Sequence, residues 1–281
     1  MRRLIVQPGT VSGDRIHITD KDDITYLSIV LRMKEGDMLL VTDGAGRAWE
    51  TSISTITRED IELSVLAENP APEDCMTRVT LYQGLPKGAK MDEIIRKATE
   101  LGVYKIVPVA TARSIPGSVN MVAMKLERWR RIAKEASKQS MRVNVPEVTG
   151  LLRFEEAAAG LADATNGLNE DAPGIADATK GFEESAPGLA GERFDLILVP
   201  YELEEEMTLK QALREPGAPA RGSGGNPLNI AVFIGPEGGF ESSEVGRLVG
   251  LGAVSVTMGS TILRTETAGP AAVAMILYEL S

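Results

Sequence analysis

From residue 230 the chain reads Ile230-Ala231-Val232-Phe233-Ile234 and continues directly as Gly235-Pro236-Glu237-Gly238-Gly239-Phe240. The apolar run predicts a buried strand, and the glycines after it predict a turn that lets the backbone approach a ligand closely. Two other apolar runs, 194–199 and 253–258, predict further strands of the same kind. Such runs are typical of a parallel sheet covered on both faces, in which ligands bind beyond the carboxyl ends of the strands.

Unusual segments follow all three predicted strands. Pro200-Tyr201-Glu202 follows the first, the glycine-rich turn the second, and Gly259-Ser260-Thr261-Ile262-Leu263-Arg264-Thr265-Glu266-Thr267-Ala268 the third. The glycine-rich turn matches neither the P-loop pattern nor the dinucleotide-binding pattern, and taken alone it indicates only a turn. Two glycine-containing loops at neighbouring strand ends favour a binding pocket, because free backbone N–H and C=O groups can recognise a flat or charged ligand.

The rest of the chain predicts an α/β protein with two domains. Residues 1–72 contain short β-branched or alternating runs at 15–19, 38–42, 48–56 and 61–66, which predict a small β-barrel, with one short helix at 23–32. The stretch 69–74 is a proline-rich linker. From residue 76 to 281, strands at 78–83 and 103–109 alternate with a helix at 91–101 and a longer helix whose apolar positions run from 122 to 136. The pattern continues with helices at about 242–251 and 270–280.

Length and composition exclude several classes of protein. The 281 residues are 43% hydrophobic and 25% charged, and no apolar run is long enough to span a bilayer. The start of the chain lacks the apolar core of a signal peptide, so we expect a cytoplasmic protein. With one cysteine, Cys75, and one histidine, His17, the chain has too few ligands or nucleophiles for a zinc finger, a His-rich metal site or Ser-His-Asp catalysis. His17 lies in an alternating run, which favours a structural role.

The net charge of −10 has a local origin. The segment 154–192 has nine acidic residues and one basic residue, and within it Leu161–Gly174 is followed by Ile175–Gly188, identical at 9 of 14 positions. These tandem copies are rich in Ala, Asp, Gly and Pro and poor in large apolar side chains, so the segment is interpreted as a solvated insertion. Without it the chain is close to neutral, and the overall acidity does not argue against an RNA partner.

A basic helix provides the strongest indication of RNA binding. Between Asn120 and Val145 there are seven basic and two acidic residues. Val122, Leu126, Trp129, Ala133 and Ala136 form its expected buried face. The remaining faces are either a solvated helix surface or a surface for RNA phosphates, and the pattern does not decide between the two.

The motifs quoted above resemble those of a known family. The glycine-rich turn, followed by Met258-Gly259-Ser260-Thr261-Ile262-Leu263-Arg264-Thr265-Glu266-Thr267-Ala268, is similar to the paired signature of the ribosomal RNA small-subunit methyltransferase E family. The similarity extends to Gln83–Val103, to the basic helix and to Val30–Met33 near the N-terminus. The resemblance implies a PUA-like β-barrel followed by a SPOUT α/β domain with a C-terminal trefoil knot. It also implies methylation of N3 of a uridine in 16S rRNA.

The resemblance further implies a cofactor and its site. S-adenosylmethionine would bind in the knot, without a metal, to residues of the three strand-end segments: Val199, Pro200, Tyr201, Glu202, Gly235, Pro236, Glu237, Gly238, Gly239, Met258, Gly259, Ser260, Ile262, Leu263, Arg264, Thr265, Thr267 and Ala268. Loss of the uracil N3 proton needs a base, and the anion needs a cation. Glu266 and Arg264 are the nearest candidates for these two roles, unless they pair with each other and only shape the loop.

For RNA, the resemblance and the charge pattern favour basic residues in both domains: Arg3, Arg32, Lys34, Lys87, Lys90, Arg113, Arg130, Arg131, Lys134, Lys138 and Arg142. The resemblance also implies a homodimer with the C-terminal helix 271–280 in its interface, although burial of that helix within one subunit would give the same apolar pattern. Two alternatives stay open from the sequence. They are a SPOUT methyltransferase that acts on another RNA, and a non-catalytic RNA-binding assembly factor.

Overall fold

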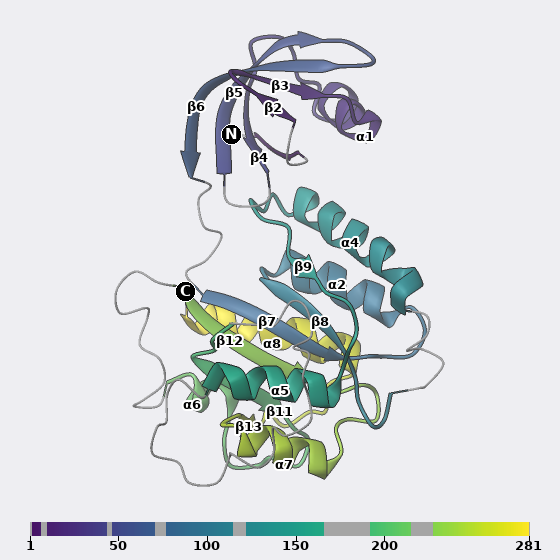
Figure 1. Cartoon of the computed structure of the whole chain (residues 1–281), viewed down its shortest axis with the longest axis vertical. Coiled ribbons are helices and arrows are strands. Elements are labelled where there is room, and N and C mark those ends of the chain that lie inside the picture. Colours follow the sequence, from purple (N-terminus) through teal and green to yellow (C-terminus); the bar gives the residue numbers. More distant parts are fainter. Residues whose placement is uncertain are drawn as a thin grey trace. The chain divides into compact units, whose positions relative to one another are not determined.

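The computed structural model describes residues 2–6, 10–43, 47–70, 77–114, 122–165, 192–214 and 227–280. The chain divides into two compact units, one made of residues 1–74 and 137–145 and the other of residues 75–136 and 146–281. Figure 1 shows the elements of both units. Among the described helices, none has the length and apolar character needed to cross a membrane.

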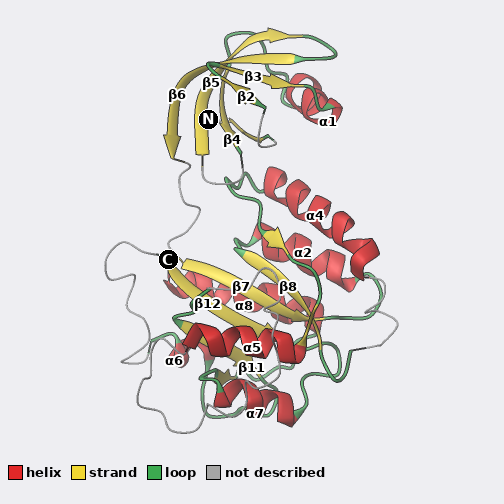
Figure 2. Cartoon of the chain, viewed as in Figure 1, coloured by secondary structure: helices red, strands yellow, loops and turns green. Residues whose placement is uncertain are grey.

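The first unit is a curled six-stranded sheet (Figure 2) with the strand order β1-β4-β5-β6-β3-β2. Its strands are β1 (Arg2–Ile5), β2 (Val11–Ser12), β3 (Arg15–Ile18), β4 (Met38–Thr42), β5 (Arg47–Ile56) and β6 (Ile61–Pro70). Two register shifts between β5 and β6 bend this pair of strands. The side chains enclosed by the sheet form one apolar core around the fully buried Ile16, Leu39 and Leu63. The strands predicted between residues 15 and 66 are confirmed.

The helical segment of the first unit differs slightly from the prediction of one helix at 23–32. Helix α1 (Lys21–Thr25) begins earlier, because the Asp20 side chain accepts hydrogen bonds from the N–H groups of Asp22 and Asp23. It passes directly into a π-helical turn, η1 (Tyr26–Val30). The single histidine, His17, lies on β3 with its Nδ1 atom 3.3 Å from Asp60 Oδ2.

Residues 137–145 belong to the first unit, although the sequence-based boundary assigns them to the second domain. The Thr42 hydroxyl donates a hydrogen bond of 3.0 Å to the carbonyl oxygen of Val143. Asp23, which is buried, forms an ion pair with Lys138. Arg3 Nη1 donates to the carbonyl oxygen of Met141 at 3.0 Å. These contacts between residues distant in sequence are not visible in a linear pattern.

The second unit contains a parallel sheet of seven strands, in the order β10-β8-β7-β12-β11-β13 with β9 beside β8. They are β7 (Thr77–Gly84), β8 (Lys105–Ala110), β9 (Glu147–Val148), β10 (Leu152–Arg153), β11 (Leu196–Pro200), β12 (Leu228–Ile234) and β13 (Val254–Val256). The central pair β7 and β12 brings Tyr82 opposite Phe233, and their rings stack with centroids 4.2 Å apart. The parallel sheet predicted from the apolar runs is confirmed.

Helices cover both faces of this sheet (Figure 1). Helices α2 (Lys90–Glu100) and α8 (Thr265–Leu280) pack against each other on one face, and α8 contacts β7 and β12. On the other face, α5 (Phe154–Thr165) and α7 (Ser242–Gly250) share a core with Tyr82 and Phe233. The remaining helices are α4 (Val122–Gln139) and the short α6 (Leu209–Ala212).

The predicted buried faces of α2 and α4 are largely confirmed. On α2, the apolar residues from Met91 to Ala98 are buried, but Leu101 is 42% exposed. On α4, Leu126 is only half-buried, whereas the other four predicted positions are buried. The buried Trp129 donates its indole N–H to Asp92 Oδ1 on α2 at 3.0 Å, so the two helices are held together by a specific hydrogen bond as well as by apolar contact.

Two sequence interpretations need correction. The acidic insertion does not start at 154, because Phe154, Ala157, Ala158 and Leu161 on α5 are buried in the core of the second unit. Residues 166–191, which hold most of the repeat, lie outside the described residues. The C-terminal helix begins at Thr265 rather than at Pro270, so the proline lies inside the helix and the segment Thr265–Ala268 is its first turn instead of a loop.

Helix α8 needs a glycine where it crosses the end of β7. A Cβ atom at Gly269 would lie 2.7 Å from Oε1 of Gln83, which is fully buried, and 3.3 Å from Leu81 Cδ2. Gly269→Ala is therefore expected to lower the free energy of unfolding by about 1–3 kcal/mol through overpacking. This loss should exceed the gain of about 1 kcal/mol that alanine usually gives over glycine in a helix. Urea unfolding of the variant and the wild type measures the difference.

The matched control is Gly246→Ala on α7, where a Cβ atom meets nothing within 4 Å. This variant should be as stable as the wild type or more stable. Equal stabilisation by the two substitutions would show that the close approach at Gly269 does not constrain the fold.

Candidate functional site

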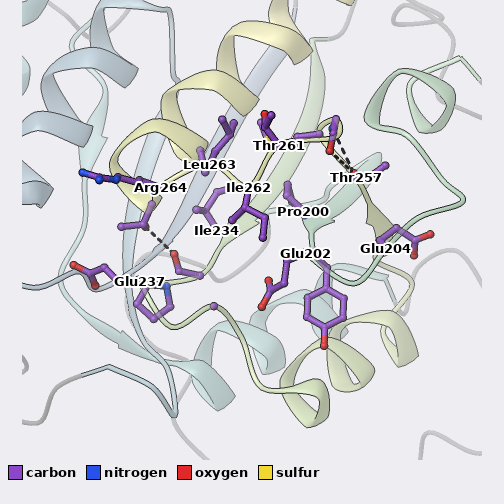
Figure 3. Close-up of a pocket in the computed structure, with 18 of the residues that line it drawn as sticks. Pro200, Glu202, Glu204, Ile234, Glu237, Thr257, Thr261, Ile262, Leu263 and Arg264 are labelled. Atoms are coloured by element: carbon purple, nitrogen blue, oxygen red, sulfur yellow. Dashed lines mark hydrogen bonds between the residues drawn. The ribbon is translucent and has the colours of Figure 1, made fainter.

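The carboxyl ends of β11, β12 and β13 meet at one edge of the parallel sheet, and a cavity of about 930 Å³ lies there. Figure 3 shows many of its lining residues, most of which come from the three segments after these strands. The sequence-based expectation that three loops meet at one pocket is confirmed by this geometry. The residues that the structure brings together there are Lys90, Pro200, Tyr201, Glu202, Glu204, Glu205, Thr208, Ile234, Gly235, Pro236, Glu237, Gly238, Gly239, Thr257, Met258, Gly259, Ser260, Thr261, Ile262, Leu263, Arg264, Thr265, Glu266 and Ala268.

Two of the expected cofactor-binding residues do not line the cavity. Val199 is fully buried within β11, in the core shared with α5 and α7. Thr267 is an exposed residue in the first turn of α8. Other lining residues were not expected from the sequence: Glu204, Glu205, Thr208, Ile234 and Thr257. Their positions just beyond predicted strands were an available signal for most of them.

The glycine loop is folded tightly on itself. A Cβ atom at Gly235 would lie 2.8 Å from the backbone carbon of Gly239 and 3.0 Å from the backbone nitrogen of Phe240. Backbone atoms cannot move aside as the end of a flexible side chain can, so this position accepts only glycine without a shift of the loop. The Gly239 N–H closes the turn by donating to the Pro236 carbonyl at 2.9 Å.

A buried polar chain connects the glycine loop to the start of α8. The Gln83 side-chain amide at the end of β7 donates to the Thr265 hydroxyl at 3.0 Å, and that hydroxyl donates to the Gly235 carbonyl at 2.8 Å. Both Gln83 and Thr265 are buried. Because buried polar groups are costly without partners, these two bonds fix the first turn of α8 against the loop.

Lys90 lies between two pocket carboxylates. Its Nζ atom is 3.0 Å from Glu237 Oε1 and 3.3 Å from Glu266 Oε2. The Glu237 carboxylate, assisted by Glu266, raises the pKa of Lys90, although partial burial opposes this change. Among the described residues, no ion pair joins Arg264 to Glu266, and the ion-pair partner of Glu266 is Lys90. The alternative in which Arg264 and Glu266 pair with each other is therefore not observed.

Both carboxyl groups have a lowered pKa. For Glu237, burial alone would raise the pKa, but its own N–H group, Lys90 and the Lys87 N–H together outweigh burial. For Glu266, its own N–H group at the start of α8 lowers the pKa most, burial opposes this, and Lys90 and Arg264 lower it further. The positive end of the α8 macrodipole acts in the same direction. Glu266 is therefore an ionised group at neutral pH.

Arg113 supports the glycine loop from outside. Its guanidinium donates to the Gly238 carbonyl, and the next residue back, Ala112, donates its N–H to Glu244 Oε1 at 2.9 Å. Glu244 is buried in the first turn of α7, where its other oxygen accepts the Glu241 N–H. The segment after β8 is thus tied both to the loop and to the helix that follows it. Arg113 was expected to bind RNA, but in the structure its guanidinium contacts the glycine loop.

The other residues expected to bind RNA are divided between the units. In the first unit, Arg32 and Lys34 are exposed, Arg142 is half-buried, and Arg3 and Lys138 have the protein partners described above. In the second unit, Lys87 is exposed and Lys134 is half-buried. On α4, Arg131 Nε lies 4.0 Å from Glu135 and Arg130 Nη1 lies 2.8 Å from Glu127, while Arg130 Nε donates to the Val148 carbonyl.

Next to the pocket, the second unit exposes large apolar side chains. Ile262 and Tyr278 are each 86% exposed, and Met275 is 43% exposed. A second cavity of about 290 Å³ lies beside α8 and is lined by residues that include Leu209, Leu213, Met275 and Tyr278. The opposite side of α8, with Ala272, Val273 and Ile276, is buried within the chain. Exposed apolar groups of this size commonly mark an interaction surface.

Family comparisons agree with the two-part architecture. Residues 73–277 match the RNA methyltransferase domain, and residues 18–66 match the RNA methyltransferase PUA domain. The PUA-like character predicted for the N-terminal domain is thereby confirmed.

Individual relatives match over nearly the whole chain. Ribosomal RNA small subunit methyltransferase E of Synechocystis is 30% identical over 98% of this chain and 76% of its own length. The protein of the same name from Bacillus subtilis is 28% identical over 96% of this chain and 90% of its own length. A crystal structure of ribosomal RNA small subunit methyltransferase E from Neisseria gonorrhoeae, bound to S-adenosyl methionine, matches with a TM-score of 0.67 and 26% identity. That match covers 98% of this chain and 96% of the other.

Arg113→Ala is expected to loosen the glycine loop, because the Gly238 carbonyl loses its charged donor. Backbone amides of residues 235–240 should exchange with deuterium about fivefold faster or more, the effect of losing about 1 kcal/mol of local stability. Hydrogen–deuterium exchange with mass spectrometry measures this rate. Arg247→Ala, a matched loss of an exposed arginine on α7, should leave the loop unchanged. Equal exchange in all three proteins would mean that Arg113 does not support the loop.

Proposed function

We propose that this chain, which belongs to the RNA methyltransferase family together with the ribosomal RNA small subunit methyltransferases E, methylates N3 of a uridine in 16S rRNA and uses S-adenosylmethionine as methyl donor. The observation that carries this proposal is the cavity formed where the glycine loop and the segment Met258–Ala268 meet. These are the two stretches that resemble the family's paired signature. The matching relatives cover both domains and most of the chain.

The cavity fits a cofactor of this kind. Its volume of about 930 Å³ lies within the range of pockets that enclose small ligands. Backbone groups of the glycine loop and of Ser260–Leu263 line it, and such groups can recognise the edge of an adenine ring. Five glutamates and two basic residues line the same cavity, so its walls complement a positively charged sulfonium: Glu202, Glu204, Glu205, Glu237 and Glu266, with Lys90 and Arg264.

When bound, S-adenosylmethionine supplies a methyl group that is already activated on a sulfonium. The protein's task is then to orient the uracil, exclude water and manage the N3 proton. We assign the proton to the Glu266 carboxylate and the stabilisation of developing negative charge on the uracil, or of a flanking phosphate, to Arg264. A carboxylate with a lowered pKa is a weak base. Glu266 therefore accepts the proton as the N3–C bond forms rather than before it.

RNA binding is proposed for exposed basic residues of both units. In the PUA domain these are Arg32 and Lys34, and in the second unit they are Lys87 and Arg131, together with the half-buried Lys134. Long cationic side chains of this kind contact phosphates and give binding that weakens with salt. Arg130 and Arg142 are also kept in the proposal, although Arg130 contacts Glu127 and the Val148 carbonyl. The protein contacts of Arg3, Lys90, Arg113 and Lys138 compete with RNA.

We also propose a cytoplasmic homodimer with the SPOUT fold and a C-terminal knot, as the family resemblance implies. The exposed apolar side chains of Ile262, Met275 and Tyr278 support the dimer, since a second copy would cover them. Because Ile262 lines the pocket, dimerisation would help to shape the site.

One experiment tests both cofactor and target. Calorimetric titration with S-adenosylmethionine should show saturable binding to the wild type and none to Gly235→Ala, in which the new methyl group displaces the loop. Small ribosomal subunits that lack the modification should then gain one methyl group at a single uridine N3 when incubated with the wild type and the cofactor. Mass mapping of digested 16S rRNA locates it.

Gly246→Ala is the matched control and should bind the cofactor as the wild type does. A wild type that binds the cofactor but methylates another RNA would contradict the target. A wild type that does not bind the cofactor, with its fold verified by circular dichroism, would favour a non-catalytic RNA-binding protein.

A further inference from the structure

We infer that Lys90 is a positioning residue that joins the glycine loop to the first turn of α8 and holds Glu266 ionised at the site where the uracil proton leaves. The inference rests on the proposed function for the role of Glu266 in the reaction. The link itself rests on contacts of the described residues. It assigns to Lys90 a role different from the RNA contact expected from its charge.

The geometry places three elements around one ammonium group. Lys90 is the first residue of α2, Glu237 belongs to the glycine loop, and Glu266 is the second residue of α8. The ammonium nitrogen lies 3.0 Å from a Glu237 oxygen and 3.3 Å from a Glu266 oxygen. Glu237 is held a second time, because its carboxylate accepts the Lys87 N–H at 3.1 Å. The segment before α2 is therefore attached to the loop through both backbone and side chain.

The three side chains differ in burial, and this difference indicates which of them depends most on the contact for its charge. Lys90 is 36% exposed and Glu237 26% exposed, but Glu266 is only 15% exposed. An ion pair this open to water contributes little to the stability of a fold. A carboxylate largely withdrawn from water, however, depends on nearby positive charge to stay ionised. The contact with Lys90 therefore affects the ionisation of Glu266 more than it affects the stability of the fold.

Charged groups face Glu266 from each adjoining element. Lys90 approaches from α2, Arg264 lies two residues earlier in the chain and acts on Glu266 electrostatically, and the N–H groups of the α8 first turn add positive potential. Glu237 is the opposing charge, since it shares the same ammonium. Removal of Lys90 would leave the Glu266 carboxylate facing that of Glu237, with Arg264 and the N–H groups of the α8 first turn still favouring its ionised form. The pKa of Glu266 would then rise.

The test measures the ionisation of Glu266 directly. Protein labelled with 13C at the glutamate carboxyl carbons is titrated by NMR, and the Glu266 signal is assigned by its loss in Glu266→Gln. In Lys90→Met the midpoint of the Glu266 titration should move to higher pH. In Lys90→Arg, which keeps the charge, it should stay near that of the wild type. This readout requires neither cofactor nor RNA.

Single-turnover methylation supplies the functional readout. The rate at pH 5.5 relative to pH 7.5 should be lower in Lys90→Met than in the wild type, because more Glu266 is protonated at the lower pH. Affinity for S-adenosylmethionine is measured in parallel to separate loss of binding from loss of proton transfer. The matched control is Lys97→Met on the same helix, whose partner Glu93 lies one turn away on α2 and not in the pocket.

Two results would overturn the inference. One is a Glu266 titration midpoint that is the same in Lys90→Met and the wild type. The other is a pH profile in Lys90→Met that runs parallel to that of the wild type while RNA affinity falls in a salt-dependent way, which would make Lys90 an RNA phosphate contact. A wild type that neither binds the cofactor nor methylates RNA would contradict the proposed function, but the NMR titration would still decide whether Lys90 controls Glu266.

Discussion

The pocket depends on the two hydrogen bonds of the Thr265 hydroxyl, because these bonds join the ends of two strands to the start of a helix. The hydroxyl accepts a hydrogen bond from Gln83 at the end of β7 and donates one to the Gly235 carbonyl just after β12. Gln83 and Thr265 are both buried, so their hydrogen bond cannot be exchanged for a bond to solvent at low cost. The close approach of Gly269 to Gln83 follows from the same arrangement, since α8 must lie directly over the strand end.

With the start of α8 fixed in this way, the charged residues of the pocket obtain defined neighbours. Glu266 follows Thr265 directly, so its carboxylate is brought to Lys90 and, through Lys90, to Glu237 on the glycine loop. On the outer side of that loop, Arg113 and Glu244 connect it to the segment after β8. The loop is therefore held by polar contacts on several sides and can present its backbone groups to a ligand in one conformation. Such preorganisation is what a site for methyl transfer requires.

Local sequence pattern was sufficient for most strands, for the parallel sheet and for the position of the pocket, because apolar runs and glycine turns act over a few residues. Local pattern gave wrong predictions where contacts between residues distant in the sequence determine the structure. Pro270 suggested the start of the last helix, as proline often does, but the bonds of Thr265 extend the helix by five residues. Lys90 and Arg113 looked like RNA ligands because their partners, Glu237 and Gly238, are more than a hundred residues away. Phe154–Leu161 was assigned to the insertion because the acidic composition of the whole segment concealed four buried positions.

The most direct test of this account is the affinity of Thr265→Val for S-adenosylmethionine, measured by calorimetry beside Thr265→Ser. Valine keeps the shape of the side chain but leaves the Gln83 amide and the Gly235 carbonyl without their shared partner, at a cost of about 1–3 kcal/mol. The account predicts a folded protein whose affinity falls about tenfold or more, whereas serine, which keeps the hydroxyl, should bind nearly as the wild type does. Wild-type affinity in Thr265→Val would show that the pocket does not depend on this hydroxyl and would contradict the account.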